Sequence, residues 1–238
     1  MDFWHFSHSE WFDVLDENAK RILNESATEH HFARRAPVFS PTPNPESAYL
    51  LLTGLVSLFR ITRDGDQLTM GFVRPGQLFG ELPILGELGR ETFATALEPC
   101  SALSIPRVTL LKIIRQCQPA SLFITKTIAE ESIRFQRRIE TLVFRSVRSR
   151  LANVLLEMVE DFGKPKGDEY QVPVRLTQTE FAQLVGASRP SVNIALNELQ
   201  KDGAILLEKS GMRVVDFNHL ASVAHDDLPR NSRRASQG

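Results

Sequence analysis

Residues 176–199 read LTQTEFAQLVGASRPSVNIALNEL, and they carry the signals of two short helices joined by a tight turn. Thr177 and Glu180 have the spacing of a capping box, so the first helix is predicted to begin at Gln178. Its apolar pattern stops at Gly186, where a residue without a Cβ atom readily adopts the positive φ angle of a sharp turn. The stretch therefore predicts a helix that ends abruptly at a glycine turn.

A second helix is expected after Ser188, whose hydroxyl caps it, and its first turn tolerates Pro190 because amides there have no intrahelical acceptor. Small Ala182 stands where the two helices would cross. Together these features predict a helix-turn-helix unit, whose second helix enters the major groove of DNA. The alternative is a plain helical hairpin with an incidental polar face. The predicted buried face of the second helix comprises Val192, Ala195, Leu196 and Leu199.

The outward face of this second helix carries side chains that can read bases. Arg189 can bond guanine O6 and N7, and Asn193 can bond adenine N6 and N7, with Ser191 between them. Hydroxyls at helix N-termini commonly hold phosphate, which we expect of Thr177, Thr179 and Ser188.

Two short apolar runs, residues 204–207 and 212–215, flank a Ser-Gly turn and predict a β-hairpin that acts as a wing. Lys209 and Arg213 would contact phosphate from this wing, or else remain solvated hairpin charges. Residues 226–238 lack apolar anchors and are predicted to be disordered.

Upstream, no Gly or Pro interrupts residues 120–146, which predicts one long helix. Its apolar residues fall near a heptad frame typical of a two-stranded dimer seam; the alternative is a helix packed on its own domain. Residues 148–162 are predicted to form another helix and residues 163–169 a polar loop. The predicted dimer seam consists of Ile128, Phe135, Ile139 and Leu142.

The N-terminal half has a different pattern. Residues 9–23 have the apolar spacing of a short helix, and residues 32–106 consist of short apolar runs broken by Pro, Gly, Asn and Asp. Such runs predict an antiparallel roll, barrel or sandwich. The clearest hairpin pairs residues 57–62 with 67–73 around Asp64-Gly65.

Composition narrows the class of protein. The 238 residues include 28 Lys and Arg against 29 Asp and Glu, so positive charge for nucleic acid must be local. Neither a membrane span nor a secretory leader is evident, which predicts a cytoplasmic protein. Cys100 and Cys117 lack the spacing of a zinc or iron–sulfur site and are expected to be buried free thiols rather than a redox pair. The candidates for local positive charge are Arg145, Arg148, Arg150, Arg189, Lys209 and Arg213.

The order of parts, an antiparallel β-roll, a long helix and a winged helix-turn-helix, makes an α+β protein that resembles the cyclic-AMP receptor protein and fumarate–nitrate regulator (CRP/FNR) superfamily of bacterial transcription factors. The resemblance is carried by residues 49–58, 75–82 and 176–199, and residues 141–151 resemble the nitrogen-regulator branch. The domains expected are a cyclic-nucleotide-binding-like sensor over 1–119, a dimerisation helix over 120–146, a DNA-binding domain over 147–225 and a tail over 226–238.

The resemblance implies a homodimer that reads palindromic half-sites about 34 Å apart in double-stranded DNA and activates or represses transcription with RNA polymerase. Family members that read the familiar TGTGA half-site begin the recognition helix with Arg-Glu and carry a further Arg. Here Arg189-Pro190 and Ile194 stand in those places, so a different half-site is expected.

The resemblance also implies a small-molecule pocket in the roll. Gly80, Glu81 and Leu82 match the segment that binds the ribose in cyclic-AMP-binding members, and Arg90 matches the phosphate-binding arginine. The match breaks at Glu91, where members have Ser, although Thr92 could supply a hydroxyl. Phe135 and Gln136 do not reproduce the polar pair that meets the adenine.

These departures argue against cyclic AMP as the effector. Another ligand such as a dicarboxylate, or none, remains open, and Glu81 and Arg90 could instead stabilise the roll as an internal ion pair or hydrogen-bonding groups. Haem is not expected, because no histidine lies within the roll proper. A second hypothesis is a small-molecule-binding module that acts on a protein partner without specific DNA binding. No motif of an enzyme is found.

Overall fold

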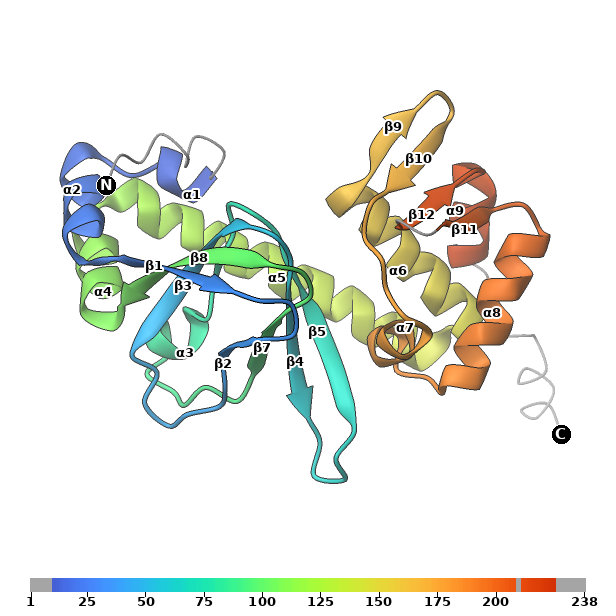
Figure 1. The fold of residues 1–238 in the computed structure, drawn as a ribbon, viewed down its shortest axis with the longest axis horizontal. Coiled ribbons are helices and arrows are strands. Elements are labelled where there is room, and N and C mark those ends of the chain that lie inside the picture. The colour runs from blue at the N-terminus through green and yellow to red at the C-terminus, as the bar shows by residue number, and fades with distance from the viewer. Residues whose placement is uncertain (1–9, 209–210, 226–238) are drawn as a thin grey trace, which may run out of the picture. The chain divides into compact units, whose positions relative to one another are not determined.

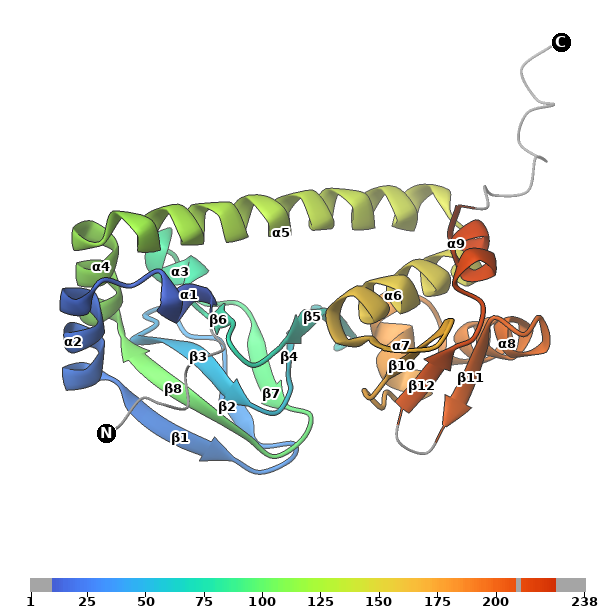
Figure 2. The ribbon, with the colours of Figure 1, turned by 90° about the horizontal axis from the view of Figure 1, so that it is seen from above.

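A computed structural model describes residues 10–208 and 211–225. The chain forms two compact units, residues 1–132 and 133–238, which are described separately (Figures 1 and 2). The first unit is a β-roll with helices, and the second contains the helix-turn-helix and a small sheet, as the sequence predicts.

The first unit contains eight strands and four complete helices among its described residues, and it ends within α5. Its helices are α1 (Glu10–Asp13), α2 (Glu17–Ser26), α3 (Leu82–Leu85), α4 (Arg107–Gln116) and the start of α5 (Gln118–Phe144). Its strands are β1 (Thr28–Phe32), β2 (Pro37–Phe39), β3 (Ser47–Thr53), β4 (Val56–Ile61), β5 (Gln67–Val73), β6 (Leu78–Phe79), β7 (Phe93–Ala96) and β8 (Cys100–Pro106).

The strands form two four-stranded antiparallel sheets, in the orders β1-β8-β3-β6 and β2-β7-β4-β5. Alternation along β3 shows how the two sheets share the core, because successive side chains point to opposite faces of a strand. Leu50 packs with Trp11 and Leu110 from the helices, whereas Leu51 packs with Val56 of the other sheet. The roll therefore has one apolar layer under α1, α2 and α4 and a second between its sheets.

The predicted hairpin of residues 57–73 is confirmed. Strands β4 and β5 pair in antiparallel register, and Gly65 has a φ angle of 89° in the connecting turn. The single helix predicted for residues 9–23 is wrong, since the segment forms α1 and α2. Asp16 separates them because its carboxylate accepts a hydrogen bond from Ala19 N at 2.7 Å and caps α2.

The second unit takes in the end of α5. Its further helices are α6 (Val147–Phe162), α7 (Gln178–Val185), α8 (Arg189–Lys201) and α9 (Phe217–His225). Its strands are β9 (Lys164–Lys166), β10 (Glu169–Val172), β11 (Ile205–Glu208) and β12 (Gly211–Val214). The strands make one antiparallel sheet in the order β11-β12-β10-β9.

Two boundaries differ from the sequence-based predictions. Residues 163–169 are not a plain loop, because β9 pairs with β10 and Gly167 turns the chain with a φ angle of 64°. Helix α5 begins and ends two residues before the predicted limits. It ends before Ser146 because the hydroxyl of Ser146 caps α6 by accepting from Ser149 N at 3.2 Å.

Helix α6 is the centre of the second unit. Leu151 and Leu155 are fully buried on it, and its polar side chains fasten α9. The hydroxyl of Ser149 and the amide of Asn153 both donate to the Ala224 carbonyl, at 2.7 and 2.9 Å. These bonds hold the last turn of α9 against the helix that also packs on α7 and α8.

Candidate nucleic-acid interface and effector site

Helix α7 begins with the predicted capping box. The Thr177 hydroxyl accepts from Glu180 N at 3.2 Å, and the Glu180 carboxylate accepts from Thr177 N at 2.6 Å. The helix ends at Gly186, which has φ 61° and ψ 48°, the left-handed conformation expected from the sequence. Local sequence signals alone thus set both ends of the first helix.

Helix α8 follows after one turn and presents its N-terminal residues to solvent. The Ser188 hydroxyl accepts from Ser191 N at 3.3 Å and lies 2.8 Å from the Ser191 hydroxyl. Arg189 and Pro190 are exposed, and Ile194 is 59% exposed one turn later. The apolar face is buried as predicted: Val192, Ala195, Leu196 and Leu199.

The sequence-based reasoning missed Gln178, which contacts two of the predicted base-reading residues. Its Nε2 donates to Asn193 Oδ1 at 2.7 Å, and its Oε1 accepts from Arg189 Nε at 3.3 Å. Thr177 and Thr179 are exposed on the same helix start. The structure therefore joins the start of α7 to Arg189 and Asn193 of α8 through Gln178.

Three arginines proposed as local positive charge have structural partners instead. Arg150 Nη1 donates to the carbonyls of Val185 at 2.8 Å and Gly186 at 3.2 Å, so it holds the C-terminal end of α7. Burial lowers the pKa of the Arg150 guanidinium. Arg145 Nη1 donates to the His225 carbonyl at 2.7 Å.

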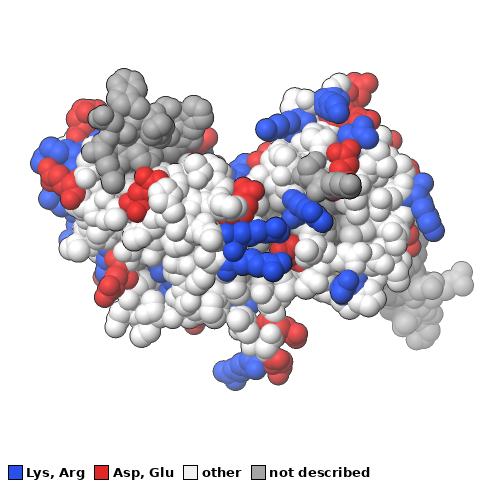
Figure 3. All heavy atoms as spheres, in the orientation of Figure 1, with Lys and Arg blue, Asp and Glu red and all other residues white. Residues whose placement is uncertain are grey.

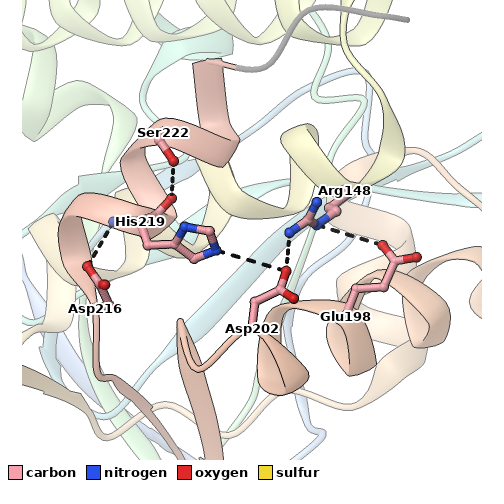
Figure 4. A network of polar contacts seen from close by, with 6 residues as sticks. All are labelled: Arg148, Glu198, Asp202, Asp216, His219 and Ser222. Carbon is pink, nitrogen blue, oxygen red and sulfur yellow. Dashed lines mark hydrogen bonds and ion pairs between the residues drawn. The ribbon is translucent and has the colours of Figure 1, made fainter.

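Arg148 belongs to the polar network in Figure 4, which joins α6 to the C-terminal end of α8 and to α9. Its guanidinium pairs with Asp202, and its Nε lies 3.7 Å from a Glu198 oxygen. His219 Nε2 on α9 lies 3.9 Å from Asp202 Oδ2. Because Arg148 pairs with these carboxylates, it holds the end of α8 against α6 and is not a phosphate contact.

The wing is confirmed as the hairpin of β11 and β12, with Glu208 opposite Gly211. Its predicted phosphate contact Arg213 lies between two carboxylates, with Nη1 2.9 Å from Glu169 and Nε 3.2 Å from Glu208. Lys209 lies outside the described residues, as do residues 226–238. On the face drawn in Figure 3, Lys and Arg of the second unit lie interspersed with Asp, Glu and uncharged residues.

In the first unit, the predicted effector residues lie partly in the interior of the roll. Glu81 is 6% exposed, and its Oε2 makes no hydrogen bond. Burial raises the pKa of Glu81 from 4.5 to about 7. The negative charge of Glu131 also raises this pKa, whereas the positive charge of Arg90 lowers it. Leu82, next to it, is exposed.

Arg90 is 5% exposed, and its charge meets backbone carbonyls rather than Glu81. Nη2 donates to the carbonyl of Ser47 at 2.6 Å and to that of Gly80 at 2.8 Å, and the guanidinium lies 4.0 Å from the ring centroid of Phe39. Its Nε makes no hydrogen bond, although it is buried. A Cβ atom on Gly80, which has φ 75°, would lie 3.0 Å from this guanidinium.

The remaining effector candidates face elsewhere. Glu91 pairs with Arg60 of β4 on the exposed side of the sheet, so it is not turned against a phosphate at Arg90. Thr92 is half-buried. Phe135 and Gln136 lie on the part of α5 that belongs to the second unit, and both are exposed.

The predicted dimer seam lies along α5. Phe135 is 52% and Ile139 47% exposed, while Ile128 and Leu142 are also exposed within the single chain. Leu142 lies close to the turn, since a Cβ atom on Gly186 would be 3.1 Å from its Cδ2. The seam residues thus form an apolar stripe that is exposed in the single chain, with Leu142 next to the turn.

Cys100 and Cys117 are buried free thiols, as predicted. The expectation that no histidine lies within the roll is wrong, because His30 and His31 lie on β1, which pairs with β8. Over residues 10–208 and 211–225, no group of three or more His, Cys, Asp or Glu side chains is placed to hold a metal ion. None of the helices in those same ranges is long and apolar enough to cross a membrane.

Comparisons with known proteins agree with this architecture. A cyclic nucleotide-binding domain model matches residues 29–117, and a Crp-like helix-turn-helix domain model matches residues 149–223. The chain is 30% identical over 210 residues to the CRP-like cAMP-activated global transcriptional regulator of Mycobacterium tuberculosis, which covers 88% of this chain and 94% of that protein.

Two further relatives show the same similarity. The chain is 28% identical over 192 residues to the global nitrogen regulator of Synechococcus elongatus, covering 80% of this chain and 86% of that protein. A crystal structure of a CRP/FNR-family transcriptional regulator from Thermus thermophilus has a TM-score of 0.65 at 27% identity, and the match covers 84% of this chain and 100% of that one.

Proposed function

Because the chain belongs to the CRP/FNR family of transcription regulators, which are not enzymes, we propose that it binds a palindromic operator as a homodimer through α8. The observation that carries this proposal is the exposed start of α8, where Arg189 bonds Gln178 through Nε and, among the described residues, neither terminal nitrogen of its guanidinium has a hydrogen-bond partner. The two terminal nitrogens form a fork of N–H donors that matches the acceptors O6 and N7 of guanine in the major groove.

The surrounding residues supply the other contacts. The capping hydroxyl of Thr177 accepts from Glu180 N and keeps a proton to donate to phosphate, as does Thr179. The hydrogen-bonded hydroxyls of Ser188 and Ser191 leave one proton of the pair for the same purpose. Ile194 offers an apolar surface to a thymine methyl group. Arg213 is left out of the proposed interface because Glu169 and Glu208 already pair with it.

Selection of bound duplexes from a random DNA pool tests the proposal, at one stated salt concentration and with or without cyclic AMP. We expect a palindrome with half-sites about one helical turn apart. Enrichment in both arms means that DNA binding does not need the nucleotide. If no sequence is enriched with or without cyclic AMP, the result would favour a module that acts on a protein partner.

For the roll, we propose a small-molecule effector that binds beside Glu81 and Arg90. The supporting observation is that Glu81 Oε2 and Arg90 Nε are buried without hydrogen bonds, which costs free energy unless a ligand completes them. The ligand would donate a hydroxyl to Glu81. Because Glu91 pairs with Arg60, its carboxylate does not repel a phosphate bound at Arg90. Phe135 and Gln136 still lack the adenine-binding chemistry expected for cyclic AMP.

Calorimetric titration with cyclic AMP and, separately, with 2-oxoglutarate as a dicarboxylate tests the effector site. Heat that disappears in Glu81→Gln but persists in Glu87→Gln, an exposed carboxylate nearby, would support it. Unchanged heat in Glu81→Gln would place the ligand elsewhere. Contact with RNA polymerase and a cytoplasmic location are inferred from the family alone.

A further inference from the structure

Gln178, the first residue of α7, connects the two α8 residues with the strongest base-reading chemistry. Its amide nitrogen donates to Asn193 Oδ1 at 2.7 Å, and its amide oxygen accepts from Arg189 Nε at 3.3 Å. We propose that Gln178 is a positioning residue that determines which atoms of Arg189 and Asn193 face the DNA bases. This inference rests on the proposed binding of DNA through α8.

The contact sets the orientation of the Asn193 amide. Because Oδ1 is directed at Gln178, the N–H groups of Nδ2 are the ones presented to a base. Two-point recognition of adenine needs Oδ1 to accept from N6–H while Nδ2 donates to N7. One lone pair of Oδ1 is taken by Gln178, and we infer that Asn193 contacts the base mainly through its Nδ2 donor instead of the two-point adenine contact expected from the sequence.

A donor selects among bases by the acceptors that they present in the major groove. Guanine presents the acceptors N7 and O6, thymine presents O4 and adenine presents N7, whereas cytosine presents only the donor N4. Asn193 therefore accepts guanine, thymine or adenine and rejects cytosine at the position it contacts. Without Gln178 the amide could turn over, and this preference would be lost.

The same amide restricts Arg189. Since Nε is held by Gln178, the guanidinium meets guanine through its two terminal nitrogens. A side chain held before binding loses less conformational entropy when the complex forms. The two α8 residues are therefore prepared by one residue of α7, although their own helix would leave both side chains free.

Exchanging Gln178 for Glu tests the orientation directly. Gln178→Glu keeps an acceptor for Arg189 but removes the donor to Asn193, so the Asn193 amide turns and presents Oδ1. In selection from a random DNA pool, we expect the position whose preference is lost in Asn193→Ala to exclude cytosine in the parent protein and to select adenine or cytosine in Gln178→Glu. Gln178→Ala should show no preference there and bind the parent operator ~5- to 50-fold more weakly.

Gln183→Glu and Gln183→Ala are matched controls, because Gln183 lies on the same helix and is similarly half-buried. They measure the effect of an added charge or a lost amide without the contact to α8, and we expect the parent base preference in both. Thermal unfolding of every variant checks the fold. A parent preference for cytosine, or a preference that persists in Gln178→Glu and Gln178→Ala, would overturn the inference while leaving the proposed function intact. Failure of the parent protein to select any sequence would overturn both.

Discussion

Glu81 illustrates how a single buried residue can link pH to stability. Its carboxyl lies inside the roll with one oxygen unpartnered, and burial raises its pKa to about 7. The folded protein therefore holds the Glu81 proton more tightly than the unfolded chain does. The same residue is the proposed hydrogen-bond acceptor for an effector, so protonation and ligand binding compete for it.

A raised carboxyl pKa lowers stability as the pH rises. Between pH 4.5 and about 7 the folded state binds more protons than the unfolded state, so the contribution of Glu81 to unfolding free energy falls by up to about 3 kcal/mol. We expect Glu81→Gln to gain stability relative to the parent at pH 8 and to lose that advantage at pH 4. Denaturant unfolding at both pH values measures the difference in unfolding free energy between the variant and the parent, with Glu87→Gln as control. A difference that does not vary with pH would contradict the prediction.

Arg189 should govern specificity rather than general DNA affinity. We expect Arg189→Ala to cost about 1–3 kcal/mol on the selected operator and to change binding to random DNA little, because the fork contacts a base. Fluorescence anisotropy with both duplexes measures the two losses. Arg175→Ala removes another exposed arginine of the same unit and should affect the two duplexes equally. Equal losses for Arg189→Ala would reject the base-reading role.

At the scale of elements, the helix-turn-helix depends on side chains from α6. Arg150 holds the end of α7 by its carbonyls, and Arg148 holds the end of α8 through Asp202. A cation beside the last carbonyls of a helix satisfies groups that have no partner within the helix. Residues outside both helices thus help to hold α7 and α8 against α6.

Removing the Arg150 contacts should loosen the turn. We expect Arg150→Met to keep the apolar volume of the side chain but to destabilise the second unit by about 1–3 kcal/mol, since two carbonyls lose a charged donor. Thermal unfolding should show a midpoint several degrees lower, and affinity for the operator should fall. Arg175→Met is the matched control and should leave the midpoint unchanged; an unchanged midpoint for Arg150→Met would show that the contacts contribute nothing.

At the scale of the whole molecule, we expect the apolar stripe of α5 to decide the oligomeric state. Ile128, Phe135, Ile139 and Leu142 repeat at heptad spacing, and all are exposed in the single chain. Ile133 is a useful contrast, because it is 49% exposed but lies about 140° around the helix from Ile128.

We therefore expect Ile139→Glu to convert the dimer to a monomer, because the substitution places a charge in the seam. Sedimentation equilibrium should give half the mass of the parent protein, and binding to a palindromic operator should weaken more than binding to a half-site. Ile133→Glu should remain dimeric. If both variants stay dimeric, the dimer uses another surface.

The sequence by itself determined the features whose causes are local. The capping box at Thr177, the left-handed turn at Gly186 and the short apolar runs broken by turn residues over 32–106 act over a few residues, so the helix-turn-helix and the roll could be predicted. The hairpin of β9 and β10 was missed because its Lys and Pro content resembles that of a loop.

Only the tertiary structure decided which polar side chains have partners within the protein and which are available to bind DNA or a ligand. Arg150 donates to a carbonyl 35 residues away in the sequence, and Arg145 donates to one 80 residues away. No local sequence pattern predicts partners at such separations. For the same reason the sequence could not reveal that Gln178 turns Asn193 or that Arg90 bonds carbonyls instead of Glu81. Helix and strand formation depend on near neighbours, whereas the partner of a charged or amide group depends on where the folded chain brings it.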